Sequence, residues 1–187
     1  MNIDGKDIIT KAQHGDEAAF TELVKLHQRE VHLLALRLLG NNEEALDISQ
    51  LVFMQAHKGL KNFRGEASLS TWLYRITYNL CMRKLKTAKW KRFMALDENI
   101  ADNRPSPDSP YKETEREDFK NNLQAALENL PPKMRAVFTM HQMQGLKMAE
   151  IAEITGKTTG NIKALHYHAI RKLREALKEW KHAEFTA

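Results

Sequence analysis

The stretch from residue 63 to residue 92 combines residue types that are suited to binding unpaired nucleic-acid bases. Trp72, Arg75, Asn79 and Lys86 share one flank of a helix by the 3.6-residue repeat. Six Lys and Arg residues follow between 83 and 92, and no acidic residue lies between 76 and 96. Aromatic rings can stack on exposed bases, and the cations can neutralise phosphate charge. An ordinary core helix with a solvated basic end would carry the same residues, so the stretch alone leaves both interpretations open.

The apolar residues of this stretch predict the helix that would position its polar side chains. Their spacing of three, four, seven and eleven residues is that of one helical stripe: Leu69, Trp72, Leu73, Ile76 and Leu80. Ser68 or Ser70 can cap the helix start by accepting a free backbone N–H, and Gly65 marks the loop before it. Tyr74 and Tyr78 fall on the far side, where a simple core helix would carry plain polar groups.

Composition sets outer limits on the class of protein. The chain has 187 residues, a formal net charge of +5 and a pI of about 9.3, which fits a nucleic-acid partner without requiring one. Its single cysteine, Cys81, excludes an internal disulfide and favours a reducing cytosol. We expect no membrane insertion, because no apolar run approaches the length of a membrane span. The N-terminus also lacks the features of a signal peptide.

The periodicity predicts an all-α chain of two small helical domains, because no segment alternates like a strand. We expect the first domain over residues 1–96, a linker over 97–112 and the second domain over 113–187. The linker holds three of the five prolines, and residues 97–118 contain eight acidic residues against three basic ones. In the first domain, helices are expected to about residue 14, from Asp16 to about 39, and from about 41 to 59. In the second, they are expected over 113–130, 131–144, 148–155 and 159–180.

A helix-turn-helix pattern occupies residues 148–162 of the second domain. The small residue Ala152 lets a second helix approach the first, and Gly156 permits the positive φ of a tight turn. Ile162 then packs back onto the first helix, so that the second helix can enter a DNA major groove. The exposed side of that helix is rich in basic and aromatic residues: Lys163, His166, Tyr167, Arg171, Lys172 and Arg174. A structural hairpin is the alternative, but the spacing, threonines and basic charge favour DNA binding.

Taken in order, these motifs resemble the extracytoplasmic-function (ECF) family of bacterial RNA polymerase sigma factors. The segment from Phe63 to Asn79 resembles the core of the family's region two. The segment from Asp47 to Ala56 is similar to the part that docks on the polymerase clamp. The segment from Leu130 to Leu173 resembles region four. The likeness covers about residues 16–177, and the order and separation of the motifs are more specific than any one of them.

The resemblance implies three binding surfaces. The clamp-docking residues would be Asp47, Gln50, Phe53 and Met54. The residues that capture a flipped base of the minus-ten element and contact nearby DNA would be Arg64, Gly65, Glu66, Ser68, Ser70, Thr71, Trp72, Arg75, Asn79, Arg83 and Lys86. The minus-thirty-five contacts would be His141, Thr159, Lys163, Ala164, Tyr167, His168 and Arg171. The acidic linker would thread through the polymerase towards the RNA exit path.

The family also implies what the protein works with. The partners would be core RNA polymerase, promoter DNA in duplex and melted form, and an anti-sigma factor. The protein would be cytoplasmic, and a membrane-anchored anti-sigma factor could hold it at the inner membrane. Neither a cofactor nor catalysis is expected. A metal site is not expected either, because His166 and His168 diverge on a helix and no Cys or acid cluster completes a site.

The chain departs from the family pattern at four positions. Leu51 stands where an acidic residue is usual, and Ala164 replaces a common serine. Leu165 and His168 replace common basic residues. Two other functions therefore stay open: a stand-alone helix-turn-helix transcriptional regulator, and a sigma-like protein that engages a regulator without initiating transcription.

Overall fold

The computed structural model describes residues 3–95 and 115–178, and all regular elements in these two ranges are helical. The predicted all-α class is confirmed. The first range contains α1 (Ile3–Gln13), α2 (Glu17–Leu39), α3 (Asn42–Gly59), the short helix η1 (Leu60–Asn62) and α4 (Leu69–Ala95). The second contains α5 (Glu115–Glu128), α6 (Pro132–Phe138), the π-helical turn η2 (Thr139–Met143), α7 (Met148–Thr155) and α8 (Thr159–Ala176). The expected linker over 97–112 and the expected helix end at residue 180 lie outside the described residues.

The helix ends follow from local chemistry that the sequence displays. Asp16 accepts hydrogen bonds from two free backbone N–H groups at the start of α2, and Asn41 caps α3 in the same way. Gly40 ends α2 in the left-handed conformation, with φ of +74°. Pro131 and Pro132 separate α5 from α6 as expected. A proline cannot continue α5 because it has no backbone N–H to donate to the preceding turn, but it is tolerated in the first turn of α6, where no such bond is needed.

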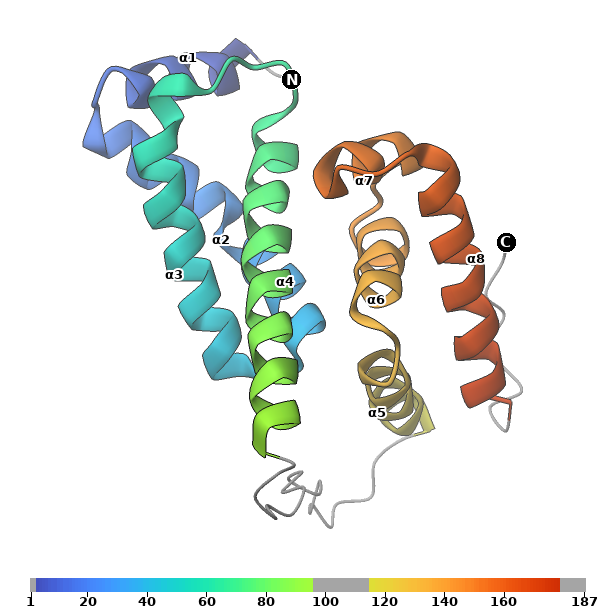
Figure 1. Cartoon of the computed structure of the whole chain (residues 1–187). Coiled ribbons are helices and arrows are strands. Elements are labelled where there is room, and N and C mark those ends of the chain that lie inside the picture. Colours follow the sequence, from blue (N-terminus) through green and yellow to red (C-terminus); the bar gives the residue numbers. More distant parts are fainter. Residues whose placement is uncertain (1–2, 96–114, 179–187) are drawn as a thin grey trace.

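Helix α4 is the central element of the molecule (Figure 1), with α2 and α3 on one side and α6 and α7 on the other. Leu69, Leu73 and Leu80 of the predicted stripe are buried, as expected. Tyr74 and Tyr78, on the far side from that stripe, are also buried, at 5% and 7% exposed. The second half of the chain covers this face, and one continuous hydrophobic core joins it to the first half.

Polar contacts tie the two halves together at both ends of the interface. The buried guanidinium of Arg135 in α6 donates to the Leu38 carbonyl at the end of α2, at 2.8 Å. It also donates to the carbonyls of Glu128 and Leu130 at the end of α5. The Tyr74 hydroxyl donates to Gln144 at 3.2 Å or to Glu30 at 3.3 Å. Arg135 thus satisfies carbonyls that two helix ends leave without partners.

No helix within residues 3–95 and 115–178 has the combination of length and apolar character needed to cross a membrane.

We predict that Arg135→Met lowers the free energy of unfolding by about 2–3 kcal/mol, because three carbonyls lose a buried donor. Urea denaturation followed by circular dichroism measures the change. Lys133→Met, at an exposed position of the same helix, is the matched control and should change stability by less than about 0.5 kcal/mol. Equal effects of the two changes would show that the Arg135 contacts contribute nothing net.

Candidate nucleic-acid and polymerase interfaces

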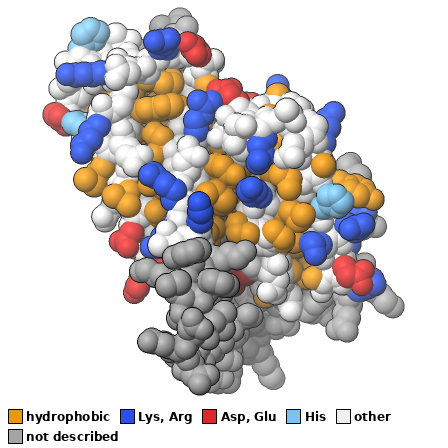
Figure 2. Space-filling model, viewed as in Figure 1, with side chains coloured by type: hydrophobic (Ala, Val, Ile, Leu, Met, Phe, Trp, Pro, Cys, Tyr) orange, Lys and Arg blue, Asp and Glu red, His pale blue; other side chains and the backbone are white. Residues whose placement is uncertain are grey.

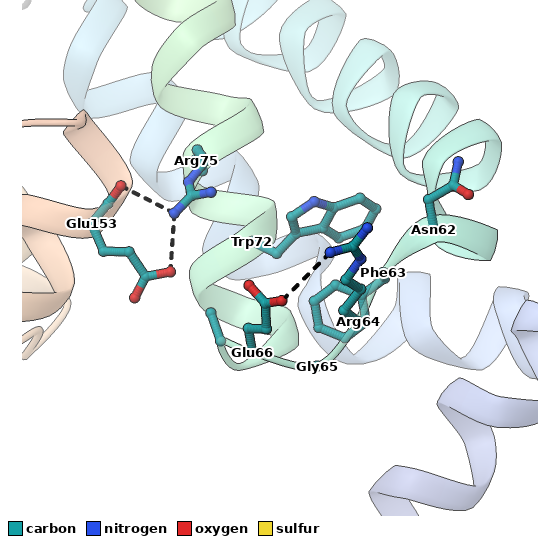
Figure 3. Close-up of a pocket in the computed structure, with 9 residues that line it drawn as sticks. Asn62, Phe63, Arg64, Gly65, Glu66, Trp72, Arg75 and Glu153 are labelled. Atoms are coloured by element: carbon teal, nitrogen blue, oxygen red, sulfur yellow. Dashed lines mark hydrogen bonds and ion pairs between the residues drawn. The ribbon is translucent and has the colours of Figure 1, made fainter.

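An open cavity of about 300 Å³ lies where the loop after η1 meets the start of α4 (Figure 3). Most of its lining comes from the segment Phe63–Asn79 that was predicted to capture a base: Phe63, Arg64, Gly65, Glu66, Ala67, Trp72 and Arg75. Asn62 of η1 lines the cavity just before this segment. Glu153 of α7 completes the lining from the other half of the chain. The Trp72 and Phe63 rings form an aromatic wall, with their centroids 5.2 Å apart. An aromatic wall beside the exposed guanidinium of Arg64 suits a planar, hydrogen-bonding ligand such as a base.

The local sequence explains the shape of this loop. Gly65 has φ of +71°, a conformation that residues with a Cβ rarely adopt. Ser68 caps α4, because its Oγ accepts from the Thr71 backbone N–H at 3.1 Å. Of the two serines proposed as caps, the structure therefore selects Ser68. Arg64 and Glu66 are highly exposed and 4.0 Å apart, so their ion pair contributes little.

The remaining predicted base-binding residues fall into three environments. Asn79, Arg83 and Lys86 are exposed further along α4. Thr71 is only 3% exposed, and its hydroxyl is hydrogen-bonded to Ser68, so it supports the loop from inside. Ser70 is half-buried.

Arg75 is already paired across the interface between the two halves. Its Nη2 donates to the Glu153 carboxylate at 3.0 Å and to the Glu153 backbone carbonyl at 3.1 Å (Figure 3). The carboxylate therefore stands beside the cavity where a nucleic-acid phosphate could otherwise pair with Arg75. Sequence reasoning did not find Glu153, because 78 residues separate the two partners and no local pattern connects them.

The helix-turn-helix has the predicted internal geometry. Ala152 is 8% exposed and Ile162 is fully buried, so α8 packs closely on α7. Gly156 forms the turn with φ of +66°, and Thr158 caps α8 by accepting from the Asn161 N–H at 3.3 Å. The predicted contact residues on the exposed side of α8 are Thr159, Lys163, Ala164, Tyr167 and Arg171, and His168 is half-buried.

Two histidines meet where η2 lies against α8. The rings of His141 and His166 are 4.8 Å apart and nearly perpendicular. His141 Nδ1 is 2.8 Å from the Leu146 carbonyl, so this nitrogen carries the proton as a donor. Burial, and secondarily the charge of His141, lower the pKa of His166. His166 was placed on the exposed face, but it is half-buried and adds no fixed positive charge at neutral pH.

The predicted clamp-docking residues lie on the outward side of α3. Asp47, Gln50 and Met54 are exposed, whereas Phe53 is half-buried and packs against the core. This surface is more apolar than expected, because Leu46, Leu51 and Met54 are 49%, 42% and 56% exposed. Leu46 and Met54 are eight residues apart and share a helix face. That spacing was the signal that could have identified Leu46 as part of the surface.

Basic side chains are spread over the face that α4, α7 and α8 present, with hydrophobic side chains between them (Figure 2). Within the described residues, no group of three or more His, Cys, Asp and Glu side chains is arranged to hold a metal ion. Cys81 is fully buried, and burial raises the pKa of its thiol to about 12.

Family models match both halves of the chain. Residues 23–91 match sigma-70 region 2, and residues 120–173 match sigma-70 region 4. A region 2 helix bundle with a loop-and-aromatic cavity, followed by a region 4 helix-turn-helix, defines a sigma-70-type protein.

Similar proteins narrow this class. The chain is 32% identical over 179 residues to the ECF sigma factor SigE of Mycolicibacterium smegmatis, covering 92% of this chain and 67% of that one. It is 32% identical over 165 residues to SigM of Mycobacterium tuberculosis, covering 87% and 79%. The chain belongs to the ECF family of RNA polymerase sigma factors.

A solved structure supports the fold. The sigma factor RpoE of Bartonella quintana, crystallised with the anti-sigma factor NepR, aligns with a TM-score of 0.69 at 21% identity. The alignment covers 85% of this chain and 96% of that one.

We predict that two glycines near the helix-turn-helix respond oppositely to alanine. Gly156→Ala should destabilise the protein by about 1–2 kcal/mol, because a Cβ disfavours its positive φ even though no other atom lies within 4 Å. Gly160→Ala, inside α8 and equally free of neighbours, should stabilise it by about 0.5 kcal/mol. Thermal unfolding measures both, and an unchanged or higher stability of Gly156→Ala would contradict the assigned turn.

Proposed function

We propose that the protein binds core RNA polymerase, directs it to specific promoters and promotes DNA melting at transcription initiation. The observation that carries the proposal is the presence, in one chain, of an aromatic-walled cavity and a helix-turn-helix. The names of the relatives, all sigma factors, support the same role. The protein acts as a binding and positioning factor, and the polymerase performs the chemistry.

The cavity beside α4 captures one base flipped from the non-template strand of the minus-ten element. The base enters beside Arg64 and stacks on the aromatic wall of Phe63 and Trp72, an interaction worth about 1–3 kcal/mol. Arg83 and Lys86, exposed on the same helix, neutralise phosphates of the melted strand. Asn79, further along α4, supplies a side-chain amide that hydrogen-bonds to the same DNA strand.

Helix α8 reads the minus-thirty-five element in the major groove. Its exposed side carries the groups that reach base edges or phosphates, with Lys163, Tyr167 and Arg171 as the main donors. The Tyr167 side chain is 64% exposed and available for apolar or hydrogen-bond contact with a base. Ala164 offers only a methyl group, which suits contact with a thymine methyl and cannot donate a hydrogen bond.

Polymerase docking uses the exposed face of α3. Asp47 and Gln50 supply polar contacts, and the exposed apolar side chains of Leu46, Leu51 and Met54 supply buried area. With Leu51 in place of the usual acid, this docking depends more on apolar burial and less on charge than the family pattern implies.

The closed arrangement of the two halves has to open for promoter recognition. The two elements are about 25 base pairs apart, or about 85 Å at about 3.4 Å per base pair. A compact chain of 187 residues is only about 40 Å across. The 19 residues from 96 to 114 can span about 65 Å when extended, which lets the halves separate while still joined.

We assign the two halves that separate to domains of residues 1–96 and 113–187. Residues 97–112 are the linker, which threads through the polymerase towards the RNA exit path. An anti-sigma factor restrains the protein by covering its polymerase-facing surfaces. The complex of the similarly folded RpoE with the anti-sigma factor NepR is the precedent. The protein works in the cytoplasm, and a membrane-anchored regulator would hold it at the inner membrane.

Co-elution with bacterial core RNA polymerase, followed by transcription from a pool of genomic fragments, tests the function. We expect a stable complex and start sites that share two short elements. Duplex binding without polymerase association would instead identify a stand-alone transcriptional regulator. Polymerase binding with no initiation on any fragment would identify a sigma-like interaction protein.

We predict that Glu153→Ala favours the open form, because it frees Arg75 from an ion pair whose side chains are 43% and 46% exposed. Such a pair contributes up to about 1 kcal/mol, so apparent affinity for core polymerase should rise about two- to fivefold. Fluorescence titration measures it, and small-angle scattering should show a larger radius. Glu175→Ala, which breaks an exposed pair within the C-terminal part of the chain, is the control. Equal behaviour of both variants would show that the Arg75 contact does not restrain opening.

A further inference from the structure

The loop that forms the cavity has few contacts of its own. Between Phe63 and Ser68 the side chains of Arg64 and Glu66 extend into solvent, at 85% and 81% exposed. A Cβ at Gly65 would meet no atom within 4 Å, so nothing packs against the turn. At its far end the loop is fixed by the Ser68 cap of α4. Its near end, at Phe63, therefore needs a separate anchor if the cavity is to keep its shape.

That anchor is the amide of Gln13, the last residue of α1. Its Nε2 donates to the Phe63 carbonyl at 2.7 Å and to the Leu60 carbonyl at 3.1 Å. A primary amide nitrogen has two hydrogens, so these two bonds use its whole donor capacity. The Phe63 carbonyl lies just past the end of η1, where helical partners run out, whereas the Leu60 carbonyl, at the start of η1, also accepts from the Phe63 backbone N–H at 3.0 Å. The two carbonyls are 47 and 50 residues from Gln13 in the sequence, so these hydrogen bonds are tertiary contacts.

The anchor is held firmly at its other end. Ile8, Ile9 and Ala12 of α1 pack against the hydrophobic core, so the helix that carries Gln13 is docked. The Phe63 carbonyl immediately precedes Arg64, and the Phe63 ring contacts Trp72. Fixing this one peptide group therefore sets the direction of the loop and the position of the aromatic wall. The sequence match to region 2 begins at residue 23, so α1 lies outside the matched segment.

We propose that Gln13 is a positioning residue for base capture. It holds the cavity loop in its binding conformation, so that binding a flipped base does not have to order the loop. The proposal rests on the proposed function of the cavity. Gln13 itself does not touch DNA in this scheme. It acts through the Phe63 peptide, and its loss should affect the cavity while leaving α3 and α8 unchanged.

The test uses Gln13→Met, which keeps the side-chain length and removes both donors, and Gln13→Glu, which sets acceptors against the two carbonyls. Gln28→Met, at an exposed glutamine of α2, is the matched control. The first readout is the rate of trypsin cleavage between Arg64 and Gly65 in the full chain. We expect it to rise about fivefold to tenfold in both Gln13 variants, as two hydrogen bonds are lost, and to stay constant in Gln28→Met.

The second readout is the binding of holoenzyme to a fork-junction DNA that carries the non-template strand of a mapped promoter. A fluorescent base analogue in that strand reports the binding. Affinity for this probe should fall about fivefold to tenfold in the Gln13 variants. Affinity for core polymerase, and for duplex DNA carrying the minus-thirty-five element, should stay at the wild-type value. Asn79→Ala serves as a comparison for a direct contact, since it should weaken probe binding without changing trypsin cleavage.

Three results would overturn the proposal, and they can be distinguished. Unchanged cleavage and unchanged probe affinity would show that the anchor is dispensable. An equal loss of core, duplex and probe binding would show a general structural role. Faster cleavage with wild-type probe affinity would show that Gln13 holds the loop but that this ordering does not contribute to base capture. If Asn79→Ala also leaves probe affinity unchanged, the assignment of this surface to base capture fails instead.

Discussion

The burial of α4 on two sides is the constraint on which the rest of the structure depends. One side packs on α2 and α3 and completes the first bundle, while Tyr74 and Tyr78 are covered from the other half of the chain. The helix thus carries the start of the base cavity, the basic residues beyond it and the contact surface for α7. Any movement of the two halves changes the surroundings of all three.

The magnitudes indicate what holds the closed form together. The Arg75–Glu153 pair is partly solvated and contributes at most about 1 kcal/mol. Burying the rings of Tyr74 and Tyr78 and the adjoining aliphatic side chains contributes more to the stability of the closed form, at about 25 cal/mol for each Å² of apolar surface. Apolar burial therefore supplies most of the stabilisation, and the ion pair adds little. A partner that opens the molecule must cover a comparable apolar area on the surfaces that separate.

The same physical reasoning distinguishes the two candidate DNA-binding sites. The helix-turn-helix is a self-contained unit, because Ala152, Gly156 and Ile162 fix α8 against α7 within a few residues. The cavity proposed to capture a base is assembled from distant parts, with Gln13 bonded to its loop and Glu153 in its lining. The first site can therefore be predicted by spacing, and the second depends on how the whole chain packs.

The sequence by itself determined the helical class, most helix ends and the helix-turn-helix, because caps, proline breaks and the spacing of apolar residues act over a few positions. It also indicated the residues of the candidate DNA and polymerase surfaces. Only the tertiary structure decided that Tyr74 and Tyr78 are buried, that Ser68 is the cap and that His166 is half-buried. It alone brought Glu153 to Arg75 and Gln13 to Phe63. These pairs are 78 and 50 residues apart, and such contacts are set by the packing of helices, which no local pattern encodes.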